Sequence, residues 1–230
     1  HIITNAPVQL TVFKKYNIQL HQYYHTDSQA VLFKNHTILN KTISYIGRFY
    51  PEKNCDLLYD AFDKLSLKYP DYTFNFYGMG DSLNDKLVTN NINIFSNWLD
   101  KDEVNNAIQK SDFIIQSSIS EGNPSIIWES FKNHTPVICS NIYGNNTAVT
   151  DGYNGYLFEL DGYESIKHNM EMTNDELIHN IDKETTLNNL LNVIEKCINI
   201  NIDDLMKLQT NSHKSWVEFS CDPLYNLLQL

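Results

Sequence analysis

The segment from residue 112 to residue 139 constrains the fold more than any other, because strand-like and helix-like patterns alternate along it. Residues 112–116 and 135–139 are short apolar runs rich in β-branched residues, which is typical of buried strands. Between them, loop-forming residues precede a helix, and Pro124 suits its first turn. This order predicts a parallel α/β sheet, with the helix N-terminus at the carboxyl edge where such sheets bind ligands.

Two glutamates flank the start of this helix, with seven residues between them. Glu121 falls in the loop, whereas Glu129 falls about one turn inside the helix, near its partly positive end. A carboxylate has two acceptor oxygens, which match the vicinal hydroxyls of a ribose or a hexose. On spacing alone, however, a solvated loop acid followed by an ordinary first-turn charge is the favoured interpretation, because a glutamate pair is a weak motif.

A second motif brings cations to the same edge of the predicted sheet. Residues 41–46 alternate like a strand and run into Gly47, where the missing side chain lets the backbone turn close to a ligand. Arg48 and Lys53 follow, just before a helix, so two cations and a helix N-terminus suit a diphosphate. The alternative is that both cations pair with surface acids. The apolar face of that helix is predicted to be Leu57, Leu58, Ala61, Phe62 and Leu65.

Five segments in this order resemble a known family. Together they are similar to the C-terminal, nucleotide-sugar-binding domain of retaining GT-B glycosyltransferases, the group-1 or family 4 type that includes bacterial mannosyl- and glucosyltransferases. The resemblance covers about residues 43–158 and implies an α/β fold: a Rossmann-like parallel sheet flanked by helices, the donor-binding half of a GT-B enzyme. The matching segments are residues 47–54, 77–80, 121–129, 136–137 and 151–157.

The resemblance implies a role for each motif residue. Arg48 and Lys53 would hold the donor diphosphate, Glu121 would face the transferred sugar, and Glu129 would bind the ribose hydroxyls of the nucleotide. Backbone amides of the intervening loop would contact the phosphate, which agrees with the anion affinity of a helix N-terminus. Pro124 has no N–H, which removes one contact. The remaining binding candidates in this segment are Gly122, Asn123, Ser125 and Ile126.

A further turn, formed by Gly78 and Gly80, follows the strand-like residues 73–76. Leu83 stands where a dinucleotide-binding fingerprint would have its third glycine, so the turn is weak evidence for NAD. The resemblance implies that this turn lies beside the donor site and that the base is read by backbone near Trp98. Alternatively, Trp98 is an ordinary packed aromatic. Because backbone reads the base, the sequence leaves UDP-sugar and GDP-sugar donors equally open.

The reaction implied by the resemblance moves a sugar from the nucleotide to an acceptor hydroxyl, with retention at the anomeric carbon. Arg48, Lys53 and the helix dipole would stabilise the leaving diphosphate, so we expect no metal and no cofactor. Residues 100–102 read Asp-Lys-Asp, the pattern of metal-dependent transferases, but they are better explained as a helix cap with first-turn acids. His21 and His25 lack a third ligand, so zinc is not expected.

The composition narrows the classes of binding partner and the cellular location that we expect. The net charge of −11 argues against binding to nucleic acid, because phosphate backbones attract basic surfaces. No apolar run is long enough to span a bilayer, so we expect a cytoplasmic domain or one that is peripheral at a membrane. Widely spaced cysteines with no Cys-x-x-Cys pair fit free thiols in a reducing compartment. These cysteines are Cys55, Cys139, Cys197 and Cys221.

The order of the patterns predicts three parts. Residues 1–40 resemble a remnant of an acceptor-side domain and its linker, residues 41–201 the nucleotide-sugar-binding domain, and residues 202–230 a C-terminal helix and tail. An acceptor glycan or lipid-linked sugar would then bind through a missing N-terminal domain, and the last helix could serve self-association. Two alternatives remain: a nucleotide-sugar-binding module without catalysis, and an NAD-type Rossmann protein, which the absent third glycine disfavours.

Overall fold

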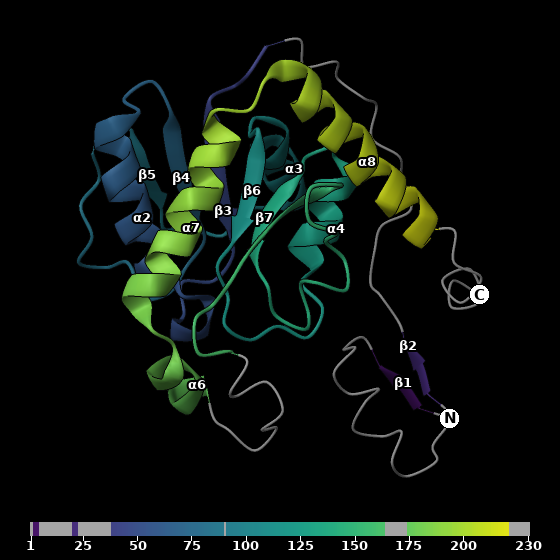
Figure 1. Ribbon diagram of the computed structural model, residues 1–230. Helices are drawn as coiled ribbons and strands as arrows, with labels where there is room; N and C mark the ends of the chain where they lie inside the picture. The colour runs from purple at the N-terminus through teal and green to yellow at the C-terminus, as the bar shows by residue number, and fades with distance from the viewer. Residues whose placement is uncertain (1, 5–19, 23–37, 90, 164–173, 221–230) are drawn as a thin grey trace.

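The computed structural model describes residues 2–4, 20–22, 38–89, 91–163 and 174–220. Its centre is a six-stranded sheet in which every neighbouring pair of strands is parallel (Figure 1). The strand order is β5-β4-β3-β6-β7-β8. The strands are β3 (Thr42–Ile46), β4 (Thr73–Tyr77), β5 (Ile92–Phe95), β6 (Phe113–Gln116), β7 (Val137–Ser140) and β8 (Gly155–Phe158).

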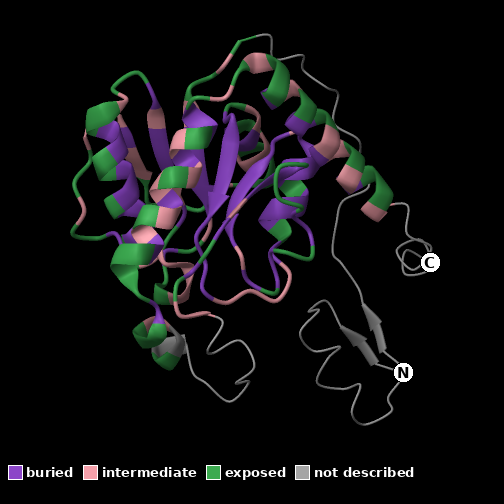
Figure 2. Ribbon diagram, in the orientation of Figure 1, coloured by how far each residue is buried: buried purple, intermediate pink, exposed green. Residues whose placement is uncertain are grey.

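Helices cover both faces of this sheet, and each face has its own apolar cluster. One cluster joins α2 (Cys55–Lys68) and α7 (Lys183–Ile198) to the sheet, and the other joins α3 (Lys101–Gln109) and α4 (Ser125–Lys132) to it. The last helix, α8 (Ile202–Ser220), runs beside α4 (Figure 1). Figure 2 shows the strands buried between these layers, with exposed residues on the outer faces of the helices.

Several elements agree with the sequence. All five residues predicted for the apolar face of α2 are buried, because they recur at helical spacing and meet the sheet. The helix cap predicted at residues 100–102 is present, and it is a capping box: Asp100 accepts from the Glu103 amide at 2.9 Å and Glu103 accepts from the Asp100 amide at 2.8 Å. Cys55, Cys139 and Cys197 are buried free thiols, and Cys221 lies outside the described residues.

One local prediction is wrong. Pro124 is the N-cap of α4 with an extended backbone (φ −71°, ψ 105°), not a residue of its first turn, and no side chain caps the helix there. A proline before Ser125 still suits this position, because the N-cap amide has no intrahelical acceptor to lose. The consequence is that α4 begins one residue later than the sequence suggests.

The beginning of the chain is described only in part. Ile2–Thr4 (β1) and Leu20–Gln22 (β2) form a separate parallel pair. His25 lies outside the described residues. A short helix, α6 (Asn174–Asn180), precedes α7. No helix among the described residues is both long and apolar enough to cross a bilayer.

The strand order creates one special position at the carboxyl edge. From β3 the chain builds outwards through β4 to β5, then crosses back to β6 and builds the other half through β7 to β8. The loops that follow β3 and β6 therefore lead away from each other to opposite sides. In open α/β sheets, ligands bind in the crevice at this topological switch point. The two motifs singled out in the sequence follow these two strands.

Candidate functional site

The loops after β3 and β6 are bound to each other. The amide of Ile119 donates to the carbonyl of Glu52 at 2.9 Å, and the Ser117 hydroxyl donates to the carbonyl of Lys53 at 2.8 Å. Lys53 ends a short 3₁₀ helix, η1 (Pro51–Lys53), that follows β3. Residues that are distant in the sequence thus meet at the switch point, as expected for adjacent parallel strands.

At this meeting point Lys53 forms an ion pair with Glu121. The ammonium lies 2.6 Å from the Oε1 atom of Glu121, and the two side chains are only 14% and 9% exposed. The same oxygen accepts hydrogen bonds from Gln116 Nε2 at 3.0 Å and from Ser118 Oγ at 2.7 Å. Lys53 therefore pairs with a largely buried acid of the predicted site rather than with a surface acid.

Arg48 lies on the exposed part of the loop after β3. Its guanidinium stands 5.0 Å from the centroid of the Tyr50 ring, an arrangement that a cation–π attraction favours. The carbonyl of Arg48 accepts a hydrogen bond of 2.8 Å from the hydroxyl of buried Tyr45, which fixes the backbone of this loop. The Arg48 head group thus remains open to solvent while its backbone is anchored to the sheet.

The three glycines of the site permit two loops to cross at van der Waals contact. Gly47 donates its amide to the carbonyl of Tyr77 at 2.9 Å. A Cβ added at Gly78 would lie 1.7 Å from the carbonyl oxygen of Gly47, and one at Gly80 would lie 2.3 Å from that of Phe49. The sequence suggested a place beside the ligand for these glycines, and the structure adds a packing reason for them.

The N-terminus of α4 points its first amides towards the same edge. Ile127 donates to the carbonyl of Pro124 at 3.1 Å, while Ser125 is exposed and Ile126 is buried. The first-turn amides of a helix have no intrahelical acceptors, so those of Ser125 and Ile126 are suited to an anion. The preceding loop of Gly122 and Asn123 is half-buried, and the Asn123 side-chain oxygen accepts from Trp128 Nε1 at 3.2 Å.

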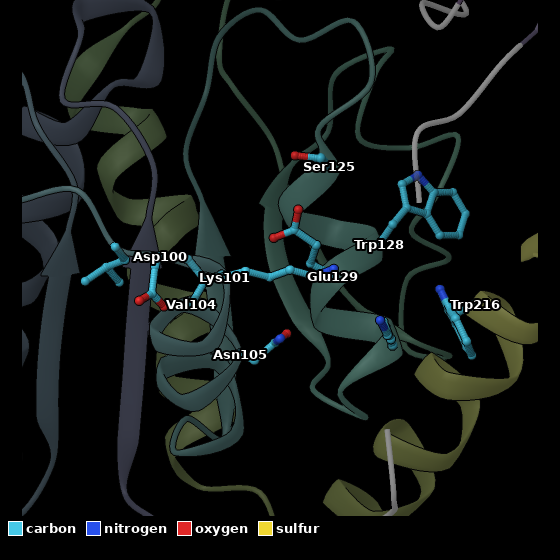
Figure 3. A pocket seen from close by; sticks show the side chains of 10 residues that line it. Asp100, Lys101, Val104, Asn105, Ser125, Trp128, Glu129 and Trp216 are labelled. Carbon is cyan, nitrogen blue, oxygen red and sulfur yellow. The ribbon is translucent and has the colours of Figure 1, made fainter. Parts of the chain in front are cut away.

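Glu129 lies in a separate hollow of about 340 Å³ between α3, α4 and α8. Figure 3 shows Lys101 extending from α3 towards Glu129, which lies on the same side of α4 as Ser125. Desolvation in the hollow raises the pKa of Glu129, and the charges of Lys101 and Lys132 oppose that rise. The lining residues are Leu99, Asp100, Lys101, Val104, Asn105, Ser125, Trp128, Glu129, Lys132 and Trp216.

The predicted residues are therefore brought together in two groups. Lys53 and Glu121 are in contact at the topological switch point, whereas the hollow around Glu129 is lined by neither of them nor by Arg48 in the described part of the chain. Trp98 is 71% exposed, so the alternative that it is a packed aromatic is wrong. It follows β5 and directly precedes Leu99, which lines the hollow.

Sequence reasoning missed Gln116 and Ser118, which both donate to Glu121. A signal existed for Gln116, because it is a polar residue that closes a buried apolar strand. A signal existed for Ser118 as well, because it stands three residues before Glu121 in the same loop. Lys101 was considered only as part of a possible metal motif, and the structure places it in the hollow with Glu129.

This strand order, with charged groups at its switch point, defines a Rossmann-like α/β domain of the type that binds nucleotides. The family model for group 1 glycosyl transferases matches residues 29–185, and this chain belongs to that family. The family and the α/β fold predicted from the ordered motifs are thereby confirmed.

Curated relatives agree with this assignment. An Escherichia coli UDP-Gal:α-D-GlcNAc-diphosphoundecaprenol α-1,3-galactosyltransferase is 27% identical over 157 residues, which are 64% of this chain and 40% of that enzyme. The GtfA subunit of a UDP-N-acetylglucosamine–peptide N-acetylglucosaminyltransferase from Streptococcus pneumoniae is 30% identical over 115 residues, or 48% of this chain and 23% of that protein. The chain thus spans less than half the length of these relatives.

Solved structures show the same fold at lower identity. TarM of S. aureus, solved with fondaparinux, α-GlcNAc-glycerol and UDP, superposes with a TM-score of 0.70 at 17% identity, covering 99% of this chain and 42% of TarM. The pneumococcal O-GlcNAc transferase GtfA, solved with UDP and GlcNAc, gives a TM-score of 0.66 at 18% identity, covering 99% and 43%. Both structures share the fold of this chain, which covers less than half of each of them.

Proposed function

We propose that this chain is the donor-binding part of an enzyme that transfers a sugar from a UDP-sugar or GDP-sugar to an acceptor hydroxyl, with retention at the anomeric carbon and without a metal. The observation that carries this proposal is the Lys53–Glu121 pair, which is buried at the topological switch point beside the N-terminus of α4. At this position the cation suits the diphosphate of a nucleotide sugar, and the acid suits the hydroxyls of its sugar.

Lys53 and Arg48 are suited to stabilise the departing diphosphate. When the glycosidic bond breaks, negative charge grows on the leaving phosphate oxygens, and preorganised cations and amides lower that barrier. The Lys53 ammonium is held by Glu121 in a largely buried position, where electrostatic interactions are less screened than in water. Exposed Arg48 and the first amides of α4 supply the remaining positive potential.

Glu129 is suited to the ribose of the nucleotide. Its carboxylate lies in a hollow of about 340 Å³ on the first turns of α4, so a nucleoside entering there would meet two acceptor oxygens. Trp98 is exposed and directly precedes Leu99, which lines this hollow, so the base of the nucleotide would lie near the backbone of these residues. The glycines at residues 47, 78 and 80 keep the neighbouring loops close together.

The hydrogen bonding of Asp100, the first acid of the Asp-Lys-Asp triplet, supports metal independence. Asp100 of the Asp-Lys-Asp triplet accepts a hydrogen bond from the Glu103 amide and is committed to capping α3. The charge that a metal would neutralise in a metal-dependent transferase is met here by Arg48, Lys53 and the helix N-terminus. We propose no cofactor other than the donor substrate itself.

The NAD-type alternative is opposed by topology. In a dinucleotide-binding fold, the glycine-rich turn follows the strand of the sheet that comes first along the chain, which is β3 here. Gly78 and Gly80 follow β4 instead, and Leu83, at the place of the third glycine, is a buried core residue. The glycines therefore serve loop packing rather than a dinucleotide turn.

The acceptor would be a glycan or a lipid-linked sugar held by a separate acceptor-side domain. The named Escherichia coli relative uses a diphosphoundecaprenol-linked acceptor, which supports a lipid-linked sugar and a location in the cytoplasm at the membrane surface. Self-association through α8 stays a prediction. The net charge of −11 supports the expectation that nucleic acid is not a partner.

Thermal-shift measurements with UDP-sugars, GDP-sugars and NAD test the proposal on the 230-residue chain. We expect saturable stabilisation by nucleotide sugars of one base and none by NAD, since only ligands of the folded state raise the melting temperature. Lys53→Met should weaken this binding by at least about tenfold, because a charge-assisted contact is lost. Lys64→Met is the matched control, because Lys64 is an exposed lysine of α2. Stabilisation that is equal in both variants would contradict the proposed site.

A further inference from the structure

The hydrogen bonds that described residues donate to the Glu121 carboxylate all end on one of its two oxygens. Oε1 accepts from Lys53 Nζ, Gln116 Nε2 and Ser118 Oγ. A carboxylate oxygen offers about two lone-pair sites, so three donors saturate it. Oε2 accepts none of these bonds, and it is absent from the buried unpartnered polar atoms of the described residues, so it reaches accessible space. The two oxygens are therefore not equivalent.

Gln116 adds a second observation. Its side chain is only 5% exposed, its Nε2 donates to Glu121, and its own Oε1 has no hydrogen-bond partner among the described residues. A buried acceptor without a partner destabilises the folded state, and an apolar side chain of the same size would avoid that loss. Residues that lower stability in this way are expected where function needs them.

The backbone of Glu121 is held as well. A Cβ at Gly144 would lie 2.5 Å from the Glu121 carbonyl oxygen, so the loop after β7 is in tight contact with it. The carbonyl of Ser118 accepts a hydrogen bond from the hydroxyl of Ser140 in β7. With the backbone fixed on this side, the direction of the carboxylate depends on the three donors to Oε1.

We propose that Gln116 and Ser118 are positioning residues that lock the Glu121 carboxylate, so that Oε1 holds Lys53 while Oε2 accepts one hydroxyl of the transferred sugar. This inference rests on the proposed function, because it requires a nucleotide-sugar donor in the crevice. It implies that Glu121 contacts the sugar through a single oxygen and does not grip a vicinal diol with both. Gln116 acts only through Glu121 and needs no contact with the substrate.

The test compares each nucleoside diphosphate with nucleotide sugars that differ from it only by the sugar. Dissociation constants are measured by titration calorimetry for UDP and UDP-glucose, UDP-galactose and UDP-N-acetylglucosamine, and for GDP and GDP-mannose. In Gln116→Leu, we expect binding of the preferred nucleotide sugar to weaken about tenfold, the usual effect of misplacing one charge-assisted hydrogen bond. Binding of the corresponding nucleoside diphosphate should change by less than about twofold, and the melting temperature should not fall.

Further variants separate positioning from general structure. Ser118→Ala should show the same selective loss, and it decides the question if Gln116→Leu does not fold. In a Glu121→Gln background, Gln116→Leu should cause no additional loss, because both changes act on one contact. Gln209→Leu is the matched control, because Gln209 is a buried glutamine of α8 whose Oε1 also lacks a partner among the described residues. It should leave the affinity for both kinds of ligand unchanged.

Two results would overturn the inference. One is equal weakening of the nucleoside diphosphate and its sugar conjugate in Gln116→Leu and Ser118→Ala, which would indicate a general distortion of the site. The other is unchanged binding of both ligands. If the unaltered chain binds no nucleoside diphosphate or nucleotide sugar at all, the proposed function itself fails, and that result is distinct from either of these.

Discussion

Glu121 and Glu129 flank the start of one helix, but their surroundings prepare them for different tasks. Glu121 is a largely buried carboxylate paired with Lys53 and bound by two further donors. Glu129 stands in a hollow where desolvation raises its pKa despite the nearby charges of Lys101 and Lys132. Glu121 is thus held by an ion pair and two hydrogen bonds, whereas Glu129 is an acceptor whose raised pKa makes its ionisation sensitive to its ligand and to pH.

Glu129→Gln should remove a pH dependence from donor binding. Because the pKa of Glu129 is raised, its carboxylate is protonated as the pH falls through that pKa, and a protonated group accepts fewer ribose hydroxyl hydrogen bonds. We expect affinity for a nucleotide sugar to fall with decreasing pH in the unaltered chain. In Glu129→Gln, affinity should be at least about tenfold lower at pH 7 and nearly independent of pH. Calorimetry between about pH 5 and pH 8 measures this.

Glu129→Gln should weaken donor binding but should not destabilise the fold. A raised folded-state pKa stabilises the fold below the pKa of the unfolded chain, and that contribution is lost as the pH rises through the folded value. At a pH above the folded value the charged carboxylate therefore gives no stabilisation, and there Glu129→Gln should melt no lower than the unaltered chain. Glu218→Gln, on the exposed side of α8, controls for removal of one charge. A pH dependence that persists in Glu129→Gln would contradict this role.

At this scale the sequence locates the charged residues but not their contacts. Arg48, Lys53 and Glu121 could be placed at the carboxyl edge, because each follows a recognisable buried strand. The Lys53–Glu121 distance could not be predicted, since it depends on two loops that are brought together only by the pairing of β3 with β6. Gln116 was missed for the same reason, because its role depends on its hydrogen bond to Glu121, which the sequence does not show.

Among the elements, the turns after β3 and β4 determine how closely the two strand ends approach. Phe49 donates to the carbonyl of Met79 at 2.8 Å, and its own carbonyl accepts from Ser82 at 3.1 Å. This ladder continues beyond the strands and requires glycine where the backbones touch. Gly78 has a φ of +153° and Gly80 a φ of +144°, values that residues with a side chain rarely adopt.

Gly78→Ala should therefore disrupt the loop that carries Arg48. Its Cβ would lie 1.7 Å from the Gly47 carbonyl oxygen, a backbone atom that cannot move aside without shifting β3. We expect a loss of about 2–4 kcal/mol in the free energy of unfolding, from overpacking together with backbone strain. Gly152→Ala is the matched control, because its φ is +72° but no atom lies within 4 Å of the added Cβ.

The control should lose only about 1–2 kcal/mol, the usual difference for a left-handed conformation without a clash. Urea unfolding of the three proteins, monitored by circular dichroism, gives both values. Equal losses in Gly78→Ala and Gly152→Ala would mean that strain alone matters and that the contact between the two turns is not tight in solution.

Strands were easier to predict than caps or long-range packing. Strands of a parallel sheet covered on both faces are continuous apolar runs, and so β6 and β7 were located within about two residues. Pro124 was placed inside α4 although it precedes it, because a proline is acceptable at either position. The packing of α8 against α4 could not be predicted, since an amphipathic pattern does not say which neighbour a helix will meet.

For the whole molecule, α8 is the element that joins the two apolar layers. Leu205 and Leu208 near its start belong to the cluster of α2 and α7, whereas Trp216 near its end belongs to the cluster of α3 and α4. Between them, the Ser212 hydroxyl donates to the carbonyl of Asn154 at 2.9 Å, next to the start of β8. The helix therefore ties the last strand of the sheet to the wall of the hollow around Glu129.

Trp216→Ala should accordingly weaken both stability and nucleotide binding. Its side chain is buried against α4 and lines the hollow, so removing it leaves a cavity beside Trp128 and Glu129. We expect a loss of about 3–5 kcal/mol in the free energy of unfolding. Donor affinity, corrected for the folded fraction, should fall as well, because the wall that fixes α4 on this side is removed.

Leu205→Ala separates the two effects. Leu205 is fully buried on the same helix but belongs to the other cluster, so its removal should cost about 2–5 kcal/mol without changing the hollow. If α8 shapes the nucleoside site through Trp216, calorimetry on the folded proteins will show weakened binding in Trp216→Ala and native affinity in Leu205→Ala. Equal affinity in both variants would mean that α8 stabilises the fold as a whole and leaves the geometry of α4 to the sheet.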